Sequence, residues 1–513
     1  MIDINQIEEQ LMQRGVRVTG VTQHLDDLEV MLSSTERIRP QEPEGNNRML
    51  IQNRDTVVSR VRKTVDEHHL PITLVGIVDV ENEPDPHYAR MLDMVVPVRI
   101  KNPNSPTPFL NPYIAVALKE MLGIQFVYSG WGFLAESDHA INIWENASLT
   151  HVGPTANTVF KLGDKVEFRK ICDELQIPIK PGTLDYVRTA EEAEALWEQY
   201  HPMMISAARG GGGMGKYVAR DKTQVRAAFD KATSQAQEAF GDGRVLVEQY
   251  LVSDGGRLRH IEVQFVGDGE GNIEIYGDRD CSVQSKYKKL IEIGPAVFIS
   301  QETRNQIYGY ARLLGGRTNY RGAGTFEFIV RKKPDGQEEI YALEINTRLQ
   351  VEHPVTEQLT GIDLVHQQLK VAMGERPESM AGRIKPGFGY AMEIRILAEY
   401  FDGNKFIPCP NRITALEWPT ESYVRVECAM VPGSIMPQRL DSTIGRMIVS
   451  GTSMEDIFEN ARKAVNATVI EGLKSTTLHD MFIPLFNNPA AVKKMLDGDY
   501  SIDNLKGILP PYS

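Results

Sequence analysis

The chain has 513 residues, of which 42% are hydrophobic and 24% are charged, and its formal net charge is −13 at pH 7. A chain of this length is expected to fold as two to four domains, each with its own core. The acidic balance argues against a nucleic-acid partner, because phosphate backbones demand a basic face. No apolar run approaches the ~18 residues of a membrane-spanning helix, so no membrane association is expected.

The cysteines and the first residues predict a cytoplasmic location. The first thirty residues carry several acids and no apolar signal region. The four cysteines are far apart, lack metal-ligand spacing and are typical of buried thiols in a reducing compartment: Cys172, Cys281, Cys409 and Cys428.

Residues 1–45 are predicted to form an N-terminal extension. Apolar residues recur at helical spacing in its first part, which predicts short amphipathic helices, and the stretch SSTERIRPQEPEGNN has the composition of a linker. The extension is either a flap packed on the main body or an arm that docks a partner.

Residues 46–177 alternate short apolar strands with helical patterns. RMLIQN and ITLVGIVDV are expected to be buried strands, and Val57, Val58, Val61 and Val65 recur at helical spacing between them. Strands that alternate with helices are typical of parallel βαβ layers, so we expect a parallel sheet in this segment.

The stretch ISAARGGGGMGKYV, which begins at residue 205, looks like a phosphate-binding loop. Gly210, Gly215 and Lys216 match the spacing of a P-loop, but Tyr217 stands where that motif needs a magnesium-binding Ser or Thr. Gly210, Gly212 and Gly215 match GxGxxG, which is a weak signal by itself. Both motifs also need a strand before the loop and a helix after it.

Residues 178–250 are instead predicted to form a small unit in which strands flank the glycines on both sides. HPMMISAA and KYVAR form a hairpin, followed by a helix over 222–239 and a strand at RVLVEQYL. A glycine-rich hairpin can act as a flap whose backbone N–H groups close on phosphates. The alternative is a flexible surface loop that binds no ligand.

The most informative stretch is YALEINTRLQVEH, which we read as one strand of a strand-rich segment that begins at residue 251. At a period of two, its apolar face holds Leu343, Ile345, Thr347, Leu349 and Val351. Its polar face holds Glu344, Asn346, Arg348, Gln350 and Glu352. A solvated face is the ordinary explanation, but such faces are rich in Lys and Thr rather than in ordered acids and amides.

These polar residues suggest a specific chemistry. Glu327 lies between two phenylalanines in GTFEFIV, and a lone acid in such a place needs a cation or a proton. Glu327 and Glu344 offer the hard oxygen ligands that suit Mg²⁺ beside nucleotide phosphates. Arg348 can clamp a planar anion, and Glu352 is a candidate base. The residues alone therefore predict a nucleotide–magnesium enzyme that acts on a small oxyanion.

At these residues the sequence resembles biotin carboxylase, a member of the ATP-grasp superfamily. The resemblance runs from about residue 48 to 500 and rests on RGAGTFEF and EINTRLQVEHPVTE, with support from GDKV, DRDCSVQ and EIRILAE. Carbamoyl-phosphate synthetases and amino-acid ligases share the flap but not LQVEHPVTE. The resemblance implies a mixed α/β and α+β fold: a Rossmann-like parallel-sheet domain at 46–177, an ATP-grasp lid at 178–250, an ATP-grasp core at 251–380 and a C-terminal biotin carboxylase domain at 381–513.

The resemblance also implies the reaction, which is transfer of a carboxyl group from bicarbonate to biotin with consumption of ATP and with Mg²⁺ or Mn²⁺ as the metal. The implied metal ligands are Glu327, Glu344 and Asn346. The implied nucleotide-binding residues are Lys165, Gly210, Gly211, Gly212, Gly213, Gly215, Glu248, Leu251, His260 and Gln284. The implied residues for bicarbonate and biotin are Lys289, Arg348, Gln350, the backbone of Val351, Glu352 as the base, and Arg395 as the cation that stabilises the biotin enolate.

The partners follow from the same resemblance. No MKM biotin-attachment stretch and no carboxyltransferase pattern occur, so we expect a biotin carboxyl carrier protein and a carboxyltransferase as separate chains. A homodimer is expected from the family. The whole complex is expected to carboxylate an acyl-CoA, with acetyl-CoA as the first candidate.

The nucleotide half departs from the family's pattern. Ser206 stands where the strand before the glycines usually carries a lysine that binds ATP phosphates, and Met214 and Lys216 replace an arginine and an apolar residue. Tyr287 replaces a histidine. Arg209 or Lys216, on either side of the glycines, could supply the missing phosphate contact.

Three functions therefore stay open. The chain is an active biotin carboxylase subunit, a catalytically weakened structural or regulatory paralogue that pairs with a competent subunit, or an ATP-grasp ligase with another acceptor. Glu352, Arg348 and Arg395 favour the first, because a catalytically inactive scaffold has no physical need for those charges. Ser206 and Tyr287 favour the second.

Overall fold

The structure is a computed structural model that describes residues 28–30, 36–37, 47–80, 83, 86–100, 107–209, 215–285, 288–380, 389–403, 405–436 and 442–510. Most of the predicted extension, and Gly210, Gly211, Gly212 and Gly213 of the predicted flap, lie outside the described residues. Where the extension is described it is strand. β1 (Leu28–Val30) lies where a helix was predicted and β2 (Glu36–Arg37) lies in the predicted linker, and both pair with a strand of the first sheet.

The N-terminal part is a seven-stranded sheet in the order β1-β5-β4-β3-β6-β7, with β2 also paired to β5. Its central strands run parallel, which confirms the predicted parallel sheet: β3 (Asn47–Ile51), β4 (Ile72–Asp79), β5 (Met94–Ile100), β6 (Phe126–Tyr128) and β7 (Thr150–His151). The four valines at helical spacing are buried on α3 (Asp55–Glu67). The other helices of this part are η2 (His87–Met91), η3 (Pro108–Leu110), α4 (Tyr113–Leu122) and α5 (Asp138–Asn146).

A small three-stranded sheet, ordered β10-β8-β9, follows α6 (Ala156–Gly163) and α7 (Lys165–Glu174). β8 (Met203–Ala207) and β9 (Lys216–Ala219) pair antiparallel on either side of the glycines, which confirms the predicted hairpin. We call this sheet and its helices the β8–β10 unit, and it has a hydrophobic core of its own. Its remaining elements are α8 (Ala190–Ala195), α9 (Trp197–Tyr200), η4 (Lys222–Gln224), α10 (Val225–Phe240) and β10 (Val245–Gln249).

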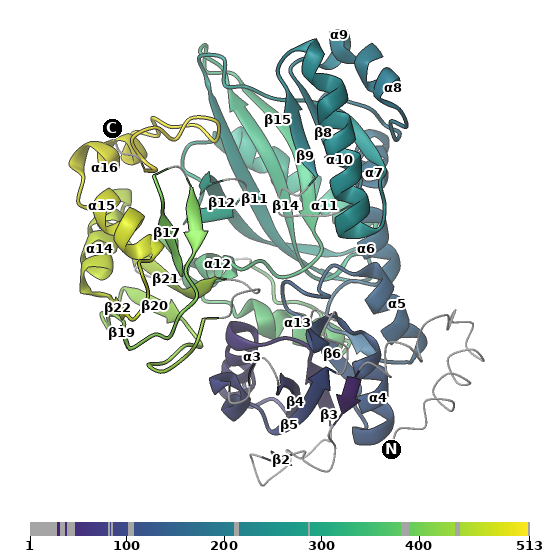
Figure 1. Cartoon of the computed structure of the whole chain (residues 1–513), viewed down its shortest axis with the longest axis vertical. Helices are drawn as coiled ribbons and strands as arrows, with labels where there is room; N and C mark the ends of the chain where they lie inside the picture. The colour runs from purple at the N-terminus through teal and green to yellow at the C-terminus, as the bar shows by residue number, and fades with distance from the viewer. Residues whose placement is uncertain are drawn as a thin grey trace.

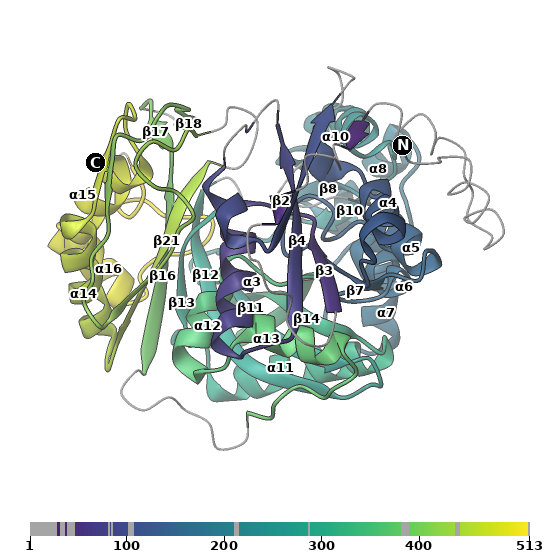
Figure 2. The same cartoon turned by 90° about the horizontal axis from the view of Figure 1, so that it is seen from below.

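The largest sheet has eight strands in the order β15-β14-β11-β12-β13-β16-β21-β20, and all its neighbours are antiparallel. Its strands are β11 (Arg257–Asp268), β12 (Ile273–Ser285), β13 (Lys288–Gly294), β14 (Arg321–Lys332), β15 (Glu338–Asn346), β16 (Tyr390–Leu397), β20 (Val424–Glu427) and β21 (Thr443–Gly451). Its helices are α11 (Gln301–Arg317), α12 (His353–Thr360) and α13 (Leu364–Ala372). α13 packs between α3 and β14, so it joins this sheet to the N-terminal part (Figures 1 and 2).

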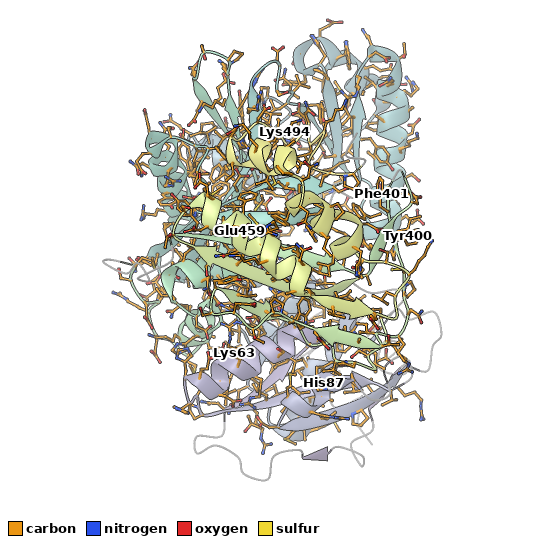
Figure 3. The ribbon with its side chains drawn as sticks, turned by 90° about the vertical axis from the view of Figure 1, so that its left-hand side faces the viewer. Lys63, His87, Tyr400, Phe401, Glu459 and Lys494 are labelled. Carbon is orange, nitrogen blue, oxygen red and sulfur yellow. The ribbon has the colours of Figure 1, made fainter. Side chains whose placement is uncertain are left out.

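The C-terminal part adds a helical layer to β16 and β21. α14 (Met454–Ala467) packs on both strands. Figure 3 looks onto this layer, with the labelled Glu459 of α14 and Lys494 on the face turned to the viewer. The other elements are β17 (Glu399–Phe401), β18 (Phe406–Pro408), β19 (Ala415–Glu417), β22 (Val469–Glu471), η5 (Leu478–Phe482), α15 (Ile483–Phe486) and α16 (Pro489–Leu496). The mixed α/β and α+β fold expected from the sequence is confirmed. None of the described helices combines the length and apolarity that crossing a membrane requires.

A buried ionic cluster ties α3 to α12 and β20. Arg60 donates to both carboxylate oxygens of Glu357, at 2.9 and 3.0 Å. Arg425 donates to Glu357 at 2.8 Å and to Glu427 at 2.5 Å. Burial alone would raise the pKa of Glu427, but Arg425 and Arg446 lower it to about 2. The three segments are therefore coupled electrostatically.

We expect the free energy of unfolding of Glu427→Gln to fall less steeply with decreasing pH than that of the native chain. The pKa of Glu427 is about 2 in the folded chain against an ordinary 4.5, so its stabilisation is present above the ordinary value and is lost as pH falls through the folded value. A carboxylate with such a shift contributes on the order of 2–3 kcal/mol at neutral pH. Urea unfolding of both chains between about pH 6 and 3 measures the difference, and superimposable slopes would contradict the role of this carboxylate.

Candidate active site

An open cavity of about 710 Å³ lies where the β8–β10 unit, the large sheet and the C-terminal residues Ile502 and Asp503 meet. Of the predicted site residues that the structure describes, only Gly215 is not part of its lining. The others line it together: Lys165, Glu248, Leu251, His260, Gln284, Lys289, Glu327, Glu344, Asn346, Arg348, Gln350, Val351, Glu352 and Arg395. The backbone N–H of Gly215 donates to Gln235 at 2.8 Å.

The polar residues from Glu344 to Glu352 do not lie on one strand, so that prediction is wrong. β15 ends at Asn346, and residues 347–352 take an irregular path into α12. The ladder between β14 and β15 also shifts beside Glu327, so that Leu343, expected on the packed face, lines the cavity together with Val351. The polar side chains still converge, because the turn after β15 directs the later ones back toward the sheet.

Lys289 lies at the centre of three carboxylates. Its Nζ is 2.5 Å from Glu262 Oε2, 2.8 Å from Glu327 Oε1 and 2.7 Å from Glu352 Oε1. Burial alone would lower the pKa of Lys289, but these three carboxylates raise it well above its ordinary value. The amine therefore stays protonated and holds together acids from β11, β14 and the turn before α12.

Glu352 is buried between two cations. Arg395 Nη2 donates to Glu352 Oε2 and to Glu292 Oε1, both at 3.0 Å, and Lys289 holds the other oxygen of Glu352. Burial alone would raise the pKa of Glu352, but Lys289, Arg395 and Arg279 hold it well below its ordinary value. Glu352 is therefore ionised, which a proton acceptor must be.

Two further acids lie beside Arg395. Glu292 of β13 and Glu393 of β16 are opposite each other in the ladder and are fully buried. Burial raises the pKa of Glu292 well above its ordinary value and the pKa of Glu393 to about 7. Near neutral pH this pair therefore carries less than its full negative charge. The positive charge of Arg395 is then less compensated by the pair and attracts an anionic ligand more strongly.

Glu327 is fixed by an ordered set of hydrogen bonds. Asn346 Nδ2 and Gln350 Nε2 donate to its Oε1 at 2.8 and 3.1 Å, and His260 Nε2 lies 2.8 Å from its Oε2. Gln284 Nε2 lies 3.1 Å from His260 Nδ1, which fits the tautomer of His260 that donates to Glu327. His260 and Gln284 thus orient a carboxylate at the edge of the cavity.

Glu327 and Glu344 fit a hard divalent cation. They are opposite each other in the ladder of β14 and β15, and both line the cavity with Asn346. Mg²⁺ prefers carboxylate oxygens combined with phosphate oxygens and water, and the cavity offers space for those beside the two acids.

Arg348 is oriented by Glu136, a residue from the segment before α5. Arg348 Nε donates to Glu136 Oε2 at 2.9 Å, and its Nη1 donates to Gln350 Oε1 at 2.9 Å. The backbone N–H of Thr347 donates to the other oxygen of Glu136 at 3.3 Å. No local pattern predicts this contact, because Glu136 and Arg348 are 212 positions apart.

The other end of the cavity is rich in lysine. Lys165 Nζ donates to the backbone of β8 at 2.9 Å, and burial together with the charge of Lys216 lowers the pKa of Lys165 to about 8. The carboxylate of Glu248 is held by Arg169 at 2.9 Å and by Lys180 at 3.0 Å. Lys165, Lys180 and Lys216 all line the cavity, and such a concentration of positive charge suits a polyanion.

Three buried charged residues that the sequence analysis did not name support the site: Glu262, Arg279 and Arg446. Arg279 donates to Glu262 at 2.5 Å and to Thr356 at 2.7 Å, and Arg446 donates to the carbonyl of Val351. The signal in the sequence was a charge within a mostly apolar strand, as Arg446 in TIGRMIVSG, since a buried charge is costly unless it is paired.

Comparisons with known proteins identify the family to which this chain belongs. Models of the biotin carboxylase N-terminal domain, the ATP-binding domain of the carbamoyl-phosphate synthase L chain and the biotin carboxylase C-terminal domain match residues 46–159, 164–379 and 393–501. The chain is 36% identical to the biotin-dependent acyl-coenzyme A carboxylase alpha3 subunit of Mycobacterium leprae, over 83% of this chain and 69% of that one. It is 32% identical to biotin carboxylase 2 of Bacillus subtilis, over 90% and 99%.

Comparison with solved structures identifies the same family as the comparison of sequences. The biotin carboxylase domain dimer of the Hydrogenobacter thermophilus 2-oxoglutarate carboxylase, in complex with MgADP, ADP and bicarbonate, has a TM-score of 0.81 and 31% identity, covering 90% of this chain and 97% of that one. A Campylobacter jejuni biotin carboxylase complex has a TM-score of 0.81 and 31% identity, covering 90% and 98%. The chain belongs to the biotin carboxylase family of ATP-dependent carboxylases.

Proposed function

We propose that this chain is the biotin carboxylase subunit of an acyl-CoA carboxylase, with acetyl-CoA as the first acceptor to test. It uses ATP, Mg²⁺ and bicarbonate to carboxylate biotin on a separate carrier protein, and a separate carboxyltransferase completes the complex with a homodimer of this chain. The observation that carries the proposal is Glu352 held between Lys289 and Arg395, in a cavity that also has paired acids for a metal and lysines for phosphates.

Bicarbonate is small, planar and anionic, and the cavity offers it matching groups. The guanidinium of Arg348 and the ammonium of Lys289 supply charge, and the amide of Gln350 and the backbone of Val351 supply hydrogen bonds. Glu136 and Gln350 already fix the plane of the Arg348 guanidinium. Arg348 therefore loses little conformational entropy when it binds the anion. Glu327 and Glu344 would hold Mg²⁺, which would screen the charge of the nucleotide phosphates when bound.

Glu352 takes the proton of bicarbonate, and the bicarbonate oxygen then attacks the γ-phosphorus of ATP while the bond to ADP breaks. In the free chain Glu352 is too acidic for this task, because Lys289 and Arg395 stabilise its charge. Binding of bicarbonate and biotin draws these two cations toward the substrates, which raises the basicity of Glu352 when it is needed.

Carboxyphosphate then breaks into CO₂ and phosphate beside biotin. The phosphate is basic enough to take the N–H proton of biotin, and Arg395 stabilises the negative charge that develops on the biotin oxygen. The nitrogen attacks CO₂, so that the carboxyl group is transferred without a free proton or an uncompensated charge in the cavity.

Phosphate release by the purified chain tests the function. With MgATP, bicarbonate and free biotin we expect steady ATP cleavage that stops when bicarbonate or Mg²⁺ is left out and rises when biotin is added. A structural or regulatory paralogue, which the exchange at Ser206 favours, predicts no ATP cleavage in any mixture. ATP cleavage that is indifferent to bicarbonate would favour a ligase with another acceptor.

A further inference from the structure

The exchange of the usual lysine for Ser206 leaves a polar group without a visible task. Ser206 is 0% exposed, and its hydroxyl has no hydrogen-bond partner among the residues that the structure describes. A hydroxyl at this position carries no charge and is too short to replace the reach of a lysine. If the chain binds nucleotide phosphates with normal strength, another cation has to provide the contact.

Lys216 is the residue directly opposite Ser206 in the ladder of β8 and β9. Its side chain is only 12% exposed and lines the cavity, and its Nζ lies 3.5 Å from Glu344 Oε2. Figure 1 shows β9 beside β15, in accord with this contact. The charge of Lys216 also acts on Lys165, whose pKa it lowers. Lys216 therefore places an ammonium group between the lysine end of the cavity and the acids suited to a metal.

Arg209, the other cation beside the glycines, is directed elsewhere. Its Nη1 lies 3.2 Å from Asp138 Oδ1 and its Nε 3.9 Å from Asp164 Oδ2. Its guanidinium also lies over the ring of Phe160, 4.9 Å from the ring centre, and Arg209 is not among the lining residues of the cavity. Binding phosphates through Arg209 would require all three contacts to be given up.

We propose that Lys216 takes the phosphate contact of the lysine that Ser206 replaces, so that this contact is moved across the hairpin from β8 to β9. The proposal rests on the proposed use of ATP and names the residue that adapts this chain to it. In the free chain the ammonium neutralises Glu344. When MgATP binds, Glu344 would hold the metal and Lys216 would turn to the phosphates. Glu344 would then keep a cation beside it, and Lys216 would keep an anion.

The test is equilibrium binding of MgATP and of adenosine, measured by calorimetry on the full chain. Loss of a charge-assisted hydrogen bond reduces affinity roughly 10- to 150-fold, so Lys216→Met is expected to weaken MgATP binding by that factor and to leave adenosine binding within about twofold. Lys216→Arg keeps the charge and is expected to retain most of the affinity. Ser206→Lys combined with Lys216→Met is expected to restore it, since it returns the lysine to β8. Arg209→Met is the matched control and is expected to bind MgATP like the native chain.

Three outcomes would overturn the proposal. Unchanged MgATP affinity in Lys216→Met would remove Lys216 from the phosphate contact while leaving the proposed function intact. An equal loss of MgATP and adenosine binding would mean that the substitution damages the cavity as a whole. If the native chain binds no MgATP at millimolar concentration, the proposed function fails together with this inference, and the paralogue takes its place.

Discussion

Replacing Glu352 by Gln is expected to lower bicarbonate-dependent turnover by roughly 10²- to 10⁴-fold, the usual contribution of a positioned general base. Gln keeps the shape and can still hydrogen-bond, but it cannot accept the proton. The chain should remain folded, because Lys289 keeps Glu262 and Glu327 as partners and Arg395 keeps Glu292. Affinity for MgATP should change little, since the acids suited to a metal are untouched.

Steady-state phosphate release with saturating MgATP and bicarbonate measures the effect. Glu427→Gln is the matched control, because it neutralises another buried carboxylate that lies outside the lining of the cavity. At neutral pH the control should turn over like the native chain once both are corrected for the folded fraction. A decrease of less than about tenfold in Glu352→Gln would remove Glu352 from the role of base.

Replacing Arg395 by Ala is expected to separate the two halves of the reaction. Loss of one group that stabilises a developing negative charge costs roughly 10²- to 10³-fold, and here the cost should fall on carboxylation of biotin. Cleavage of ATP with bicarbonate alone should be better preserved. The enolate that Arg395 stabilises forms only after carboxyphosphate, and loss of the Arg395 charge raises rather than lowers the basicity of Glu352 in the first step. Arg395 also neutralises Glu352 and hydrogen-bonds to Glu292, so some loss of stability is expected in addition.

Carboxylation of free biotin and biotin-independent ATP cleavage are measured on the same preparation, so that an unfolded fraction lowers both equally. Arg395→Lys keeps a charge beside the two acids and is expected to recover part of the carboxylation. Equal losses in both assays for Arg395→Ala and Arg395→Lys would place Arg395 earlier in the mechanism or only in the fold.

Much of the site was predictable because its chemistry is unusual for buried strands. Glu327 among phenylalanines, and the alternation of acids, amides and a guanidinium from Glu344 to Glu352, have no simple explanation in packing. Parallel βαβ layers were predictable from the alternation of apolar strands with helical spacing, and the hairpin from strands on both sides of the glycines. These signals are all local in the sequence.

The remainder depends on contacts between distant segments. A period of two cannot reveal that the ladder shifts beside Glu327 or that β15 ends at Asn346, because a bulge is decided by the partner strand. The approach of Glu136 to Arg348 is likewise set by how the N-terminal part packs on the large sheet. From the sequence alone, Arg209 and Lys216 are equally good candidates for the phosphate contact. Only the contacts of each side chain in the structure distinguish them.

The pairing of β13 with β16 has a consequence for any attempt to divide this chain. Ile291 to Gly294 are bonded to Ala391 to Ile394, so the segments matched by two different family models share one continuous ladder. A fragment that stops before β16 would leave β13 without its neighbour on that side, and the unpaired backbone groups of such an edge strand are a template for aggregation. The parts of the chain before and after residues 381–388 are therefore not expected to fold independently. Splitting the gene at these residues should yield two insoluble fragments.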